Sequence, residues 1–352
     1  MLSLQSLLKG VFQRRYALQN VAVSSFQQLD LKCAMKMSTA KKRVIVDVDV
    51  GTDDALALLV LLHAEKNGLA KIEAINCSKG NASLKDVTRN VIRLLEILDR
   101  TDIPVYKGAT EALIPPETPI PQFHGKDGFG DLEHEKEPDV SIVQKDSASV
   151  AMRNLVINNP GQISLICIGP LTNIALTMKL FDDFAPNIKE IFIMGGNYAA
   201  TGNVTETAEF NFYVDPEAAY IVLENAQCPL TIATWETCLN THLTFRWRFD
   251  VLGSKNTPIM ELLNRAEKSI YPEKENPPDS IWYPCDALCV IAMLYPNESI
   301  TKQSKHNATV ELHGSKTRGQ IVLDHLKQKD PNVTMLEKIN DEFIKEILLQ
   351  AT

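Results

Sequence analysis

Residues 44–55 read VIVDVDVGTDDA, and this stretch decides the fold. The segment from Val44 to Val50 is mostly β-branched, a composition typical of a buried strand. Gly51 permits a tight turn, and the run from Ala55 to Lys66 has helical character. The stretch therefore predicts a strand that leads directly into a helix.

The alternation of strand and helix continues along the chain. Further strands are expected at residues 72–76, 104–106, 163–168, 191–194 and 230–234, and helices at 83–98, from 171 onward and at 216–225. This alternation predicts an α/β fold, with a mainly parallel central sheet and helices on both faces. No change of composition divides residues 43–350, so residues 41–352 are expected to form one domain.

Composition and charge disfavour several classes of protein. The 352 residues carry a formal net charge of −8, and a negative surface disfavours nucleic acid as a partner. No run of about eighteen apolar residues occurs, so no contact with the membrane interior is expected. The seven cysteines are odd in number and form no CxxC pair, which indicates a reducing compartment and favours a cytoplasmic location.

Residues 1–40 differ in composition from the rest of the chain. The first 29 residues contain three basic side chains and no acidic one, together with several serines and glutamines. This composition suits a mitochondrial presequence. It equally suits a flexible N-terminal extension ahead of a later start at Met35 or Met37, and both interpretations stay open.

Four aspartates, Asp47, Asp49, Asp53 and Asp54, lie within eight residues of one another. Asp47 and Asp49 alternate along the strand and so leave the same face, whereas Asp53 and Asp54 fall at the start of the helix. One aspartate would be enough to cap that helix. Four carboxylates would repel one another strongly if they were buried without a cation, so the cluster predicts a metal site.

The donor atoms of this cluster indicate which metal it would hold. Carboxylates alone favour a hard cation, Ca²⁺ or Mg²⁺, over Zn²⁺ or Cu²⁺. The spacing matches neither an EF-hand loop nor a P-loop. The site is expected at the carboxyl end of the first strand, where open α/β sheets bind ligands.

Several short motifs follow the acidic stretch. They are Gly80-Asn81, HGKDG at 124–128, GPLTN at 169–173, MGG at 194–196, AEFN at 208–211, DPEAA at 215–219 and TRG at 317–319. Together with DVDVGTDDA at 47–55, they resemble the signature of the inosine-uridine-preferring nucleoside hydrolase family over about residues 43–345. The resemblance implies a calcium-dependent enzyme that hydrolyses the N-glycosidic bond of ribonucleosides. It also implies a homodimer or homotetramer.

The same resemblance implies roles for individual residues. Asp49 would bind calcium and act as the general base, and Asp54, Asp286 and the backbone carbonyl of Ile168 would be further calcium ligands. Asp47 would support the site. The positions implied to bind the substrate are Asp53, Asn81, Met194, Asn203, Glu209 and Asn211.

Cys285 departs from the pattern of many family members, which carry a histidine there to help the base leave. The sequence around it, Pro284-Cys285-Asp286, resembles a subgroup with cysteine in place of histidine. His124 then becomes the candidate acid for the leaving base, with a histidine that only contacts the substrate as an equal alternative. The expected catalytic positions are therefore Asp49, His124 and Cys285.

The expected reaction breaks the glycosidic bond through an oxocarbenium-like state, with water arriving from the face opposite the base. Asp49 would take a proton from that water. Two alternatives stay open: a catalytically weak ribonucleoside-binding protein, and a phosphohydrolase of the haloacid dehalogenase type with Asp47 as its nucleophile. The choice between purine and pyrimidine bases is also left open.

Overall fold

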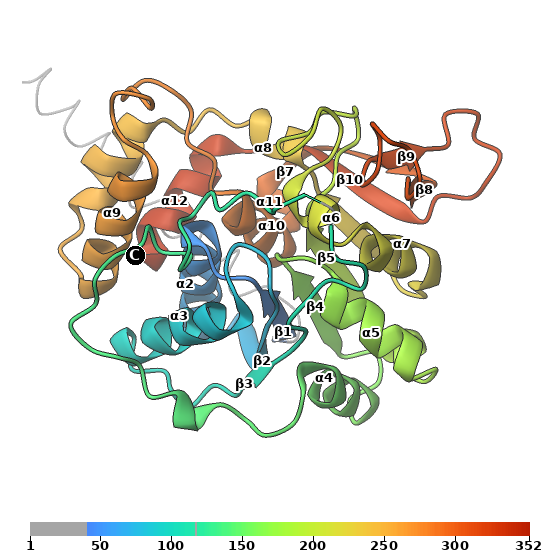
Figure 1. The fold of residues 1–352 in the computed structure, drawn as a ribbon, viewed down its shortest axis with the longest axis horizontal. Helices are drawn as coiled ribbons and strands as arrows, with labels where there is room; N and C mark the ends of the chain where they lie inside the picture. Colours follow the sequence, from blue (N-terminus) through green and yellow to red (C-terminus); the bar gives the residue numbers. More distant parts are fainter. Residues whose placement is uncertain (1–40, 117) are drawn as a thin grey trace, which may run out of the picture. The chain divides into compact units, whose positions relative to one another are not determined.

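A computed structural model describes residues 41–116 and 118–352, and the expectations for residues 1–40 lie outside these ranges. Residues Lys42–Thr352 form one compact unit. Its centre is an eight-stranded sheet in the order β3-β2-β1-β4-β5-β6-β10-β7 (Figure 1). Neighbouring strands run parallel except β10 and β7, which are antiparallel. The predicted α/β fold with a mainly parallel sheet is confirmed.

The strands agree with the sequence pattern as far as β6. Those of the main sheet are β1 Lys42–Val48, β2 Ala70–Cys77, β3 Val105–Lys107, β4 Ile163–Cys167, β5 Glu190–Met194, β6 Leu230–Ala233, β7 Ile300–His306 and β10 Val333–Ile339. A separate antiparallel hairpin joins β8 Ala308–Val310 and β9 Ile321–Leu323. The pattern predicts no strand after β6, so β7, β8, β9 and β10 were missed; β7 reads ITKQSKH and is mostly polar.

Helices cover both faces of the sheet. The longer ones are α2 Thr52–Lys66, α3 Leu84–Ile97, α4 Ala148–Ile157, α5 Thr172–Leu180, α7 Pro216–Asn225, α9 Pro258–Ile270, α10 Cys285–Leu294 and α12 Asp341–Ala351. The short helical segments are η1 Val140–Ile142, η2 Ala185–Asn187, α6 Phe210–Val214, α8 Trp235–Leu239, η3 Trp247–Val251, η4 Leu252–Ser254 and α11 Pro296–Ser299. Figure 1 shows α2, α3, α9 and α12 on one side of the sheet and α4, α5 and α7 on the other.

Strand β1 separates two hydrophobic cores. Val44, Val46 and Val48 pack into the core that contains α2, whereas Ile45 packs into the core that contains α5. Successive side chains of a strand point to opposite faces, so an unbroken apolar run is what a sheet covered on both faces requires. Every residue of α10 is buried, including Asp286, and its other residues belong to the first core.

The chain order reverses at the centre of the sheet. Strands β1, β2 and β3 extend to one edge, while β4, β5 and β6 extend to the other. A reversal of this kind opens a crevice at the carboxyl ends of the central strands. Asp49 follows β1, Asn81 follows β2, Ile168 follows β4 and Met194 ends β5. The topology therefore brings these four positions to the same end of the sheet.

Two further features concern the described part of the chain. None of its helices is long and apolar enough to cross a membrane. Its cysteines are all free, and they are Cys77, Cys167, Cys228, Cys238, Cys285 and Cys289.

Candidate active site

A cavity of about 390 Å³ lies at the carboxyl ends of the central strands. Most of the site residues expected from the sequence line it, namely Asp53, Asn81, His124, Ile168, Met194, Asn203, Glu209, Asn211, Cys285 and Asp286. Asp47, Asp49 and Asp54 are buried and do not line the cavity. Asp49 and Asp54 accept hydrogen bonds from Asn81, and Asp47 accepts one from Asn173. The fold thus gathers residues that are far apart in the sequence into a single cavity.

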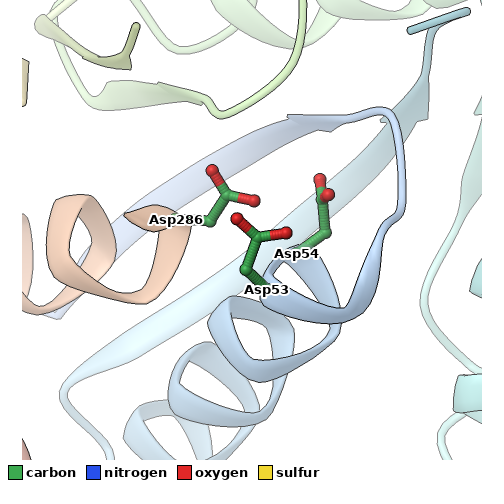
Figure 2. Close-up of side chains that lie close together, drawn as sticks. All are labelled: Asp53, Asp54 and Asp286. Atoms are coloured by element: carbon green, nitrogen blue, oxygen red, sulfur yellow. The ribbon is translucent and has the colours of Figure 1, made fainter. Parts of the chain in front are cut away.

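Three carboxylates face one another beside this cavity. Asp53 and Asp54 extend from the first turn of α2 and Asp286 from the first turn of α10, all toward the same space (Figure 2). One oxygen of each lies within 4.8 Å of the others. The predicted ligand set contains Asp49 in place of Asp53, so the structure adds Asp53 to the residues that could hold a metal ion.

Asp49 lies just beyond the end of β1, in a space that two glycines leave open. A Cβ atom at Gly80 would lie 2.0 Å from Oδ2 of Asp49, and one at Gly169 would lie 2.9 Å from Oδ1. The Asn81 backbone N–H donates to Oδ2 at 2.7 Å. The other oxygen, Oδ1, is buried and has no hydrogen-bond partner among the residues that the structure describes.

Asp54 is both a helix cap and a member of the cluster. Its Oδ2 accepts a hydrogen bond from Gly51 N at 2.8 Å, and its Oδ1 accepts one from Asp49 N at 3.2 Å. The capping interpretation therefore describes part of the role of Asp54.

Asp47 lies outside the cluster and is bonded to a different element, because its Oδ2 accepts a hydrogen bond from the Asn173 side chain at 2.9 Å. Burial raises the pKa of Asp47 to about 7.

Burial and mutual repulsion raise the pKa values of the aspartates in the cluster. Burial and then the charge of Asp53 raise the pKa of Asp54 to about 8. Burial raises the pKa of Asp49 and of Asp286 well above the usual range, and neighbouring carboxylates add to the effect. A bound cation would reverse these shifts by favouring the ionised forms. The all-oxygen donor set, with carboxylate oxygens of Asp53, Asp54 and Asp286 within 4.8 Å of one another, fits a hard divalent cation.

Asn211 and Glu209 form another wall of the cavity. The Asn211 amide nitrogen donates to the carbonyl oxygens of Ile168 and Met194, each at 3.1 Å. Because two carbonyls can only accept, they fix the orientation of the amide. Its buried Oδ1 has no partner in the described chain and is left to accept from a ligand.

The Glu209 carboxylate is held by the backbone. It accepts from Gly196 N at 2.7 Å, Asn211 N at 3.0 Å and Phe212 N at 3.2 Å, and so caps α6. Burial raises its pKa to about 7, although these donors act in the opposite direction. Glu209 therefore presents a fixed carboxylate to the cavity.

His124 and Cys285 occupy different environments in the cavity. His124 lies against the start of α2, with Nδ1 3.3 Å from Thr52 Oγ1 and Nε2 3.4 Å from Asp53 Oδ1. Burial lowers the pKa of His124, and the Asp53 carboxylate opposes this shift. Burial and the adjacent Cys238 raise the pKa of the Cys285 thiol well above its usual range.

An aromatic part of the cavity is absent from the sequence predictions. It is lined by Phe123, Trp235, Phe245, Tyr271 and Tyr283. Ring centroids lie 5.3 Å apart for Trp235 and Tyr283 and 4.9 Å apart for Phe245 and Tyr271. Phe123 directly precedes the HGKDG motif and Tyr283 lies in a Pro-containing loop at 273–284, whereas Trp235, Phe245 and Tyr271 belong to no motif.

These features define an α/β protein with an acidic cluster beside a mixed polar and aromatic cavity. The chain belongs to the inosine-uridine preferring nucleoside hydrolase family, whose model matches residues 44–346. It is therefore an enzyme that hydrolyses N-glycosyl bonds. The family prediction made from the short motifs is confirmed.

Individual relatives agree with this assignment. The non-specific ribonucleoside hydrolase RihC of Salmonella enteritidis is 33% identical over 293 residues, which cover 81% of this chain and 89% of the relative. A solved inosine-guanosine nucleoside hydrolase superposes with a TM-score of 0.79 at 27% identity, covering 88% of this chain and 98% of that one. The plant nucleoside hydrolase PpNRh1 gives a TM-score of 0.77 at 26% identity, with the same coverage of both chains.

Proposed function

We propose that this chain hydrolyses the N-glycosidic bond of ribonucleosides with the help of a bound calcium ion, releasing free base and ribose. The observation that carries the proposal is that the Asp53, Asp54 and Asp286 carboxylates meet beside a cavity whose lining could bind both a sugar and a base. That cavity has hydrogen-bonding groups at one part and aromatic rings at another. The printed names of RihC and the inosine-guanosine enzyme support a ribonucleoside as substrate.

The proposed calcium ligands are Asp49, Asp54, Asp286 and the backbone carbonyl of Ile168. The Ile168 oxygen accepts from Asn211 and retains a second lone pair for an ion. When bound, the ion supplies Lewis acidity and the positive charge that keeps these buried carboxylates ionised. Asp53 lines the cavity, and the resemblance to the family assigns it to the ribose hydroxyls.

The proposed general base is Asp49. Asn81 N–H holds Oδ2, so the unpartnered Oδ1 is the atom that takes the proton of the attacking water. The water oxygen bonds to the anomeric carbon as the bond to the base breaks, and the base departs with that electron pair. Nearby carboxylates stabilise the positive charge that develops on the ribose. Asp47 supports the site through its bond to Asn173.

Polar residues around the cavity are proposed to hold the ribose. They are Asn81, Met194, Asn203, Glu209 and Asn211, in addition to Asp53. Asn211 Oδ1 and the fixed Glu209 carboxylate can accept from hydroxyls. A site with such groups disfavours sugars that lack the hydroxyls, because buried polar atoms are then left unpaired. The aromatic side chains are proposed to surround the base, with Cys285 nearby.

The two alternative functions can be compared with the geometry. A dehalogenase-type phosphohydrolase requires Asp47 as nucleophile, but Asp47 is buried, is bonded to Asn173 and does not line the cavity. Family membership also disfavours it. A catalytically weak binding protein would keep the same ribose contacts, and turnover distinguishes it from the enzyme.

The test is ribose release from inosine, adenosine, guanosine, uridine and cytidine by the full chain. We expect release from at least one nucleoside, loss of release after exhaustive chelation, and recovery with added Ca²⁺ at about one ion per chain. Binding of nucleosides without turnover would favour the weak binding protein. Stoichiometric zinc, or full activity after chelation, would contradict the calcium assignment.

The oligomeric state and the cellular location are also proposed. The resemblance to the family supports a homodimer or homotetramer, which sedimentation of the purified chain would test. The free cysteines support a cytoplasmic location. A reporter fused to residues 1–36 would test the alternative of mitochondrial import.

A further inference from the structure

Thr52 lies within the acidic stretch but has no part in the reaction described above. It is buried at the start of α2, with 1% of its surface exposed. Its backbone N–H donates to Nδ1 of His124 at 3.4 Å, and its hydroxyl lies 3.3 Å from the same atom. Because a backbone N–H can only donate, Nδ1 must present a lone pair, and the proton of a neutral ring must lie on Nε2.

The protonated side of the His124 ring faces Asp53. Nε2 lies 3.4 Å from Asp53 Oδ1, and that buried oxygen has no hydrogen-bond partner in residues 41–116 and 118–352. The separation exceeds a short hydrogen bond, and such contacts commonly tighten when substrate binds. The only N–H of the ring is thus aimed at a buried carboxylate oxygen that needs a donor.

Packing holds the ring in this orientation. A Cβ atom at Gly51 would lie 2.8 Å from the His124 ring, so the ring rests directly on the backbone of the turn. The Phe123 ring meets His124 edge-on, with centroids 5.1 Å apart, and Phe123 in turn packs against Tyr271 at 5.5 Å. A 180° turn of the ring would exchange Nδ1 with Cδ2, so that a C–H would face the Thr52 N–H and the hydrogen bond would be lost.

We propose that Thr52 and His124 are positioning residues for Asp53: the Thr52 N–H fixes the tautomer of His124, and its Nε2–H orients the Asp53 carboxylate toward the ribose. This inference rests on the proposed function, in which Asp53 contacts the ribose hydroxyls. Both ring nitrogens then face protein groups, so His124 is not the acid that protonates the leaving base. On this proposal, His124 positions Asp53 and does not act as the acid that the sequence analysis suggested.

Two amide substitutions of His124 test the contacts of Nε2 and Nδ1 separately. His124→Gln places an amide N–H near the position of Nε2, where it can reach Asp53. His124→Asn reaches only the position of Nδ1, where its oxygen can accept from Thr52. Neither amide can relay a proton as an acid. We expect His124→Gln to retain most of the wild-type kcat/KM. In His124→Asn and His124→Ala, kcat/KM should fall roughly 10- to 100-fold, the usual effect of losing a hydrogen bond to a charged group.

The loss should be equal on a natural ribonucleoside and on a nitrophenyl riboside, whose leaving group needs no acid. A loss confined to the natural substrate, or a Gln variant as poor as Ala, would overturn the proposal. Nitrogen-15 NMR of histidine-labelled full chain gives a readout that is independent of activity, with His124→Gln identifying the signals. We expect a protonated Nε2 and an unprotonated Nδ1 in the neutral ring. Protonation at Nδ1 would refute the inference even if the wild type proves inactive, and wild-type inactivity alone would count against the proposed function.

Discussion

The Asn81 backbone N–H donates to Oδ2 of Asp49 at 2.7 Å and leaves Oδ1 of that carboxylate without a partner in the described chain. This arrangement separates the atom that is held from the atom that can accept a proton. Gly80 and Gly169 make room for it, since a side chain at either position would meet the carboxylate.

Asp49→Asn should lower turnover of ribonucleosides by roughly 100-fold or more, the usual contribution of a general base. The amide keeps the size of the side chain but cannot take a proton at the position of Oδ1. Calcium content must be measured alongside, because Asp49 is also a proposed ligand. Asp182→Asn, at an exposed position, is the matched control. Near-normal turnover of the Asp49 variant would remove it from the base role.

Gly80→Ala should lower kcat by roughly 100-fold without comparable loss of stability, because a displacement of about 1 Å at a reacting group has effects of that size. The added Cβ would lie 2.0 Å from Asp49 Oδ2 and displace the carboxylate. Gly161→Ala is the control, since Gly161 has φ +68° and open space around its Cα. It should cost about 1 kcal/mol of stability and leave kcat unchanged. Equal kcat values for the two variants would contradict this account.

Cys285→Ala should reduce kcat/KM by less than about tenfold on both natural nucleosides and a nitrophenyl riboside. Burial and Cys238 raise the thiol pKa, so Cys285 stays protonated and is a poor proton relay. Cys289→Ala, one helical turn further along α10, is the comparison for packing effects. Loss of turnover on both substrates with calcium still bound would show a direct catalytic role for the thiol.

Arg248 and Glu267 form a buried ion pair at 2.7 Å, with side chains 0% and 1% exposed. Arg248→Met should lower the free energy of unfolding by about 3–5 kcal/mol, because it leaves a buried carboxylate without its partner. Adding Glu267→Leu should recover most of the loss, since the unpaired charge is then removed. Urea unfolding of the single and double variants measures the difference. A double variant no more stable than the single one would show that packing dominates.

Glu73 accepts from Arg43 at 2.7 Å and Lys71 at 2.9 Å, and these partners lower its pKa. A carboxyl group whose pKa is lower in the folded state stabilises the protein above its unfolded pKa and loses that effect as the pH falls. Glu73→Gln should therefore cost up to about 1 kcal/mol at pH 7 and nothing near pH 2. Thermal unfolding of both proteins at the two pH values tests this, and a cost independent of pH would exclude an ionic cause.

The sequence predicted the strands and helices of the first part of the chain well. Local signals explain this success, as in α3, where Ser83 accepts from Asp86 N, and in α7, where Asp215 caps a helix that begins with Pro216. The strands after β6 were not predicted, among them the polar strand β7. Its place in the sheet depends on pairing with β10, which is a contact between distant segments.

By itself, the sequence determined the α/β class, the family and the group of polar residues that share one site, because periodicity, turn residues and motifs are local properties of the chain. Only the tertiary structure brought Asp286 to Asp53 and Asp54, gathered the aromatic residues around the cavity, and turned the Nε2 side of His124 toward Asp53. Each of these depends on how separate elements pack. Distances and hydrogen-bond directions between such elements are set by the whole fold, and no local pattern encodes them.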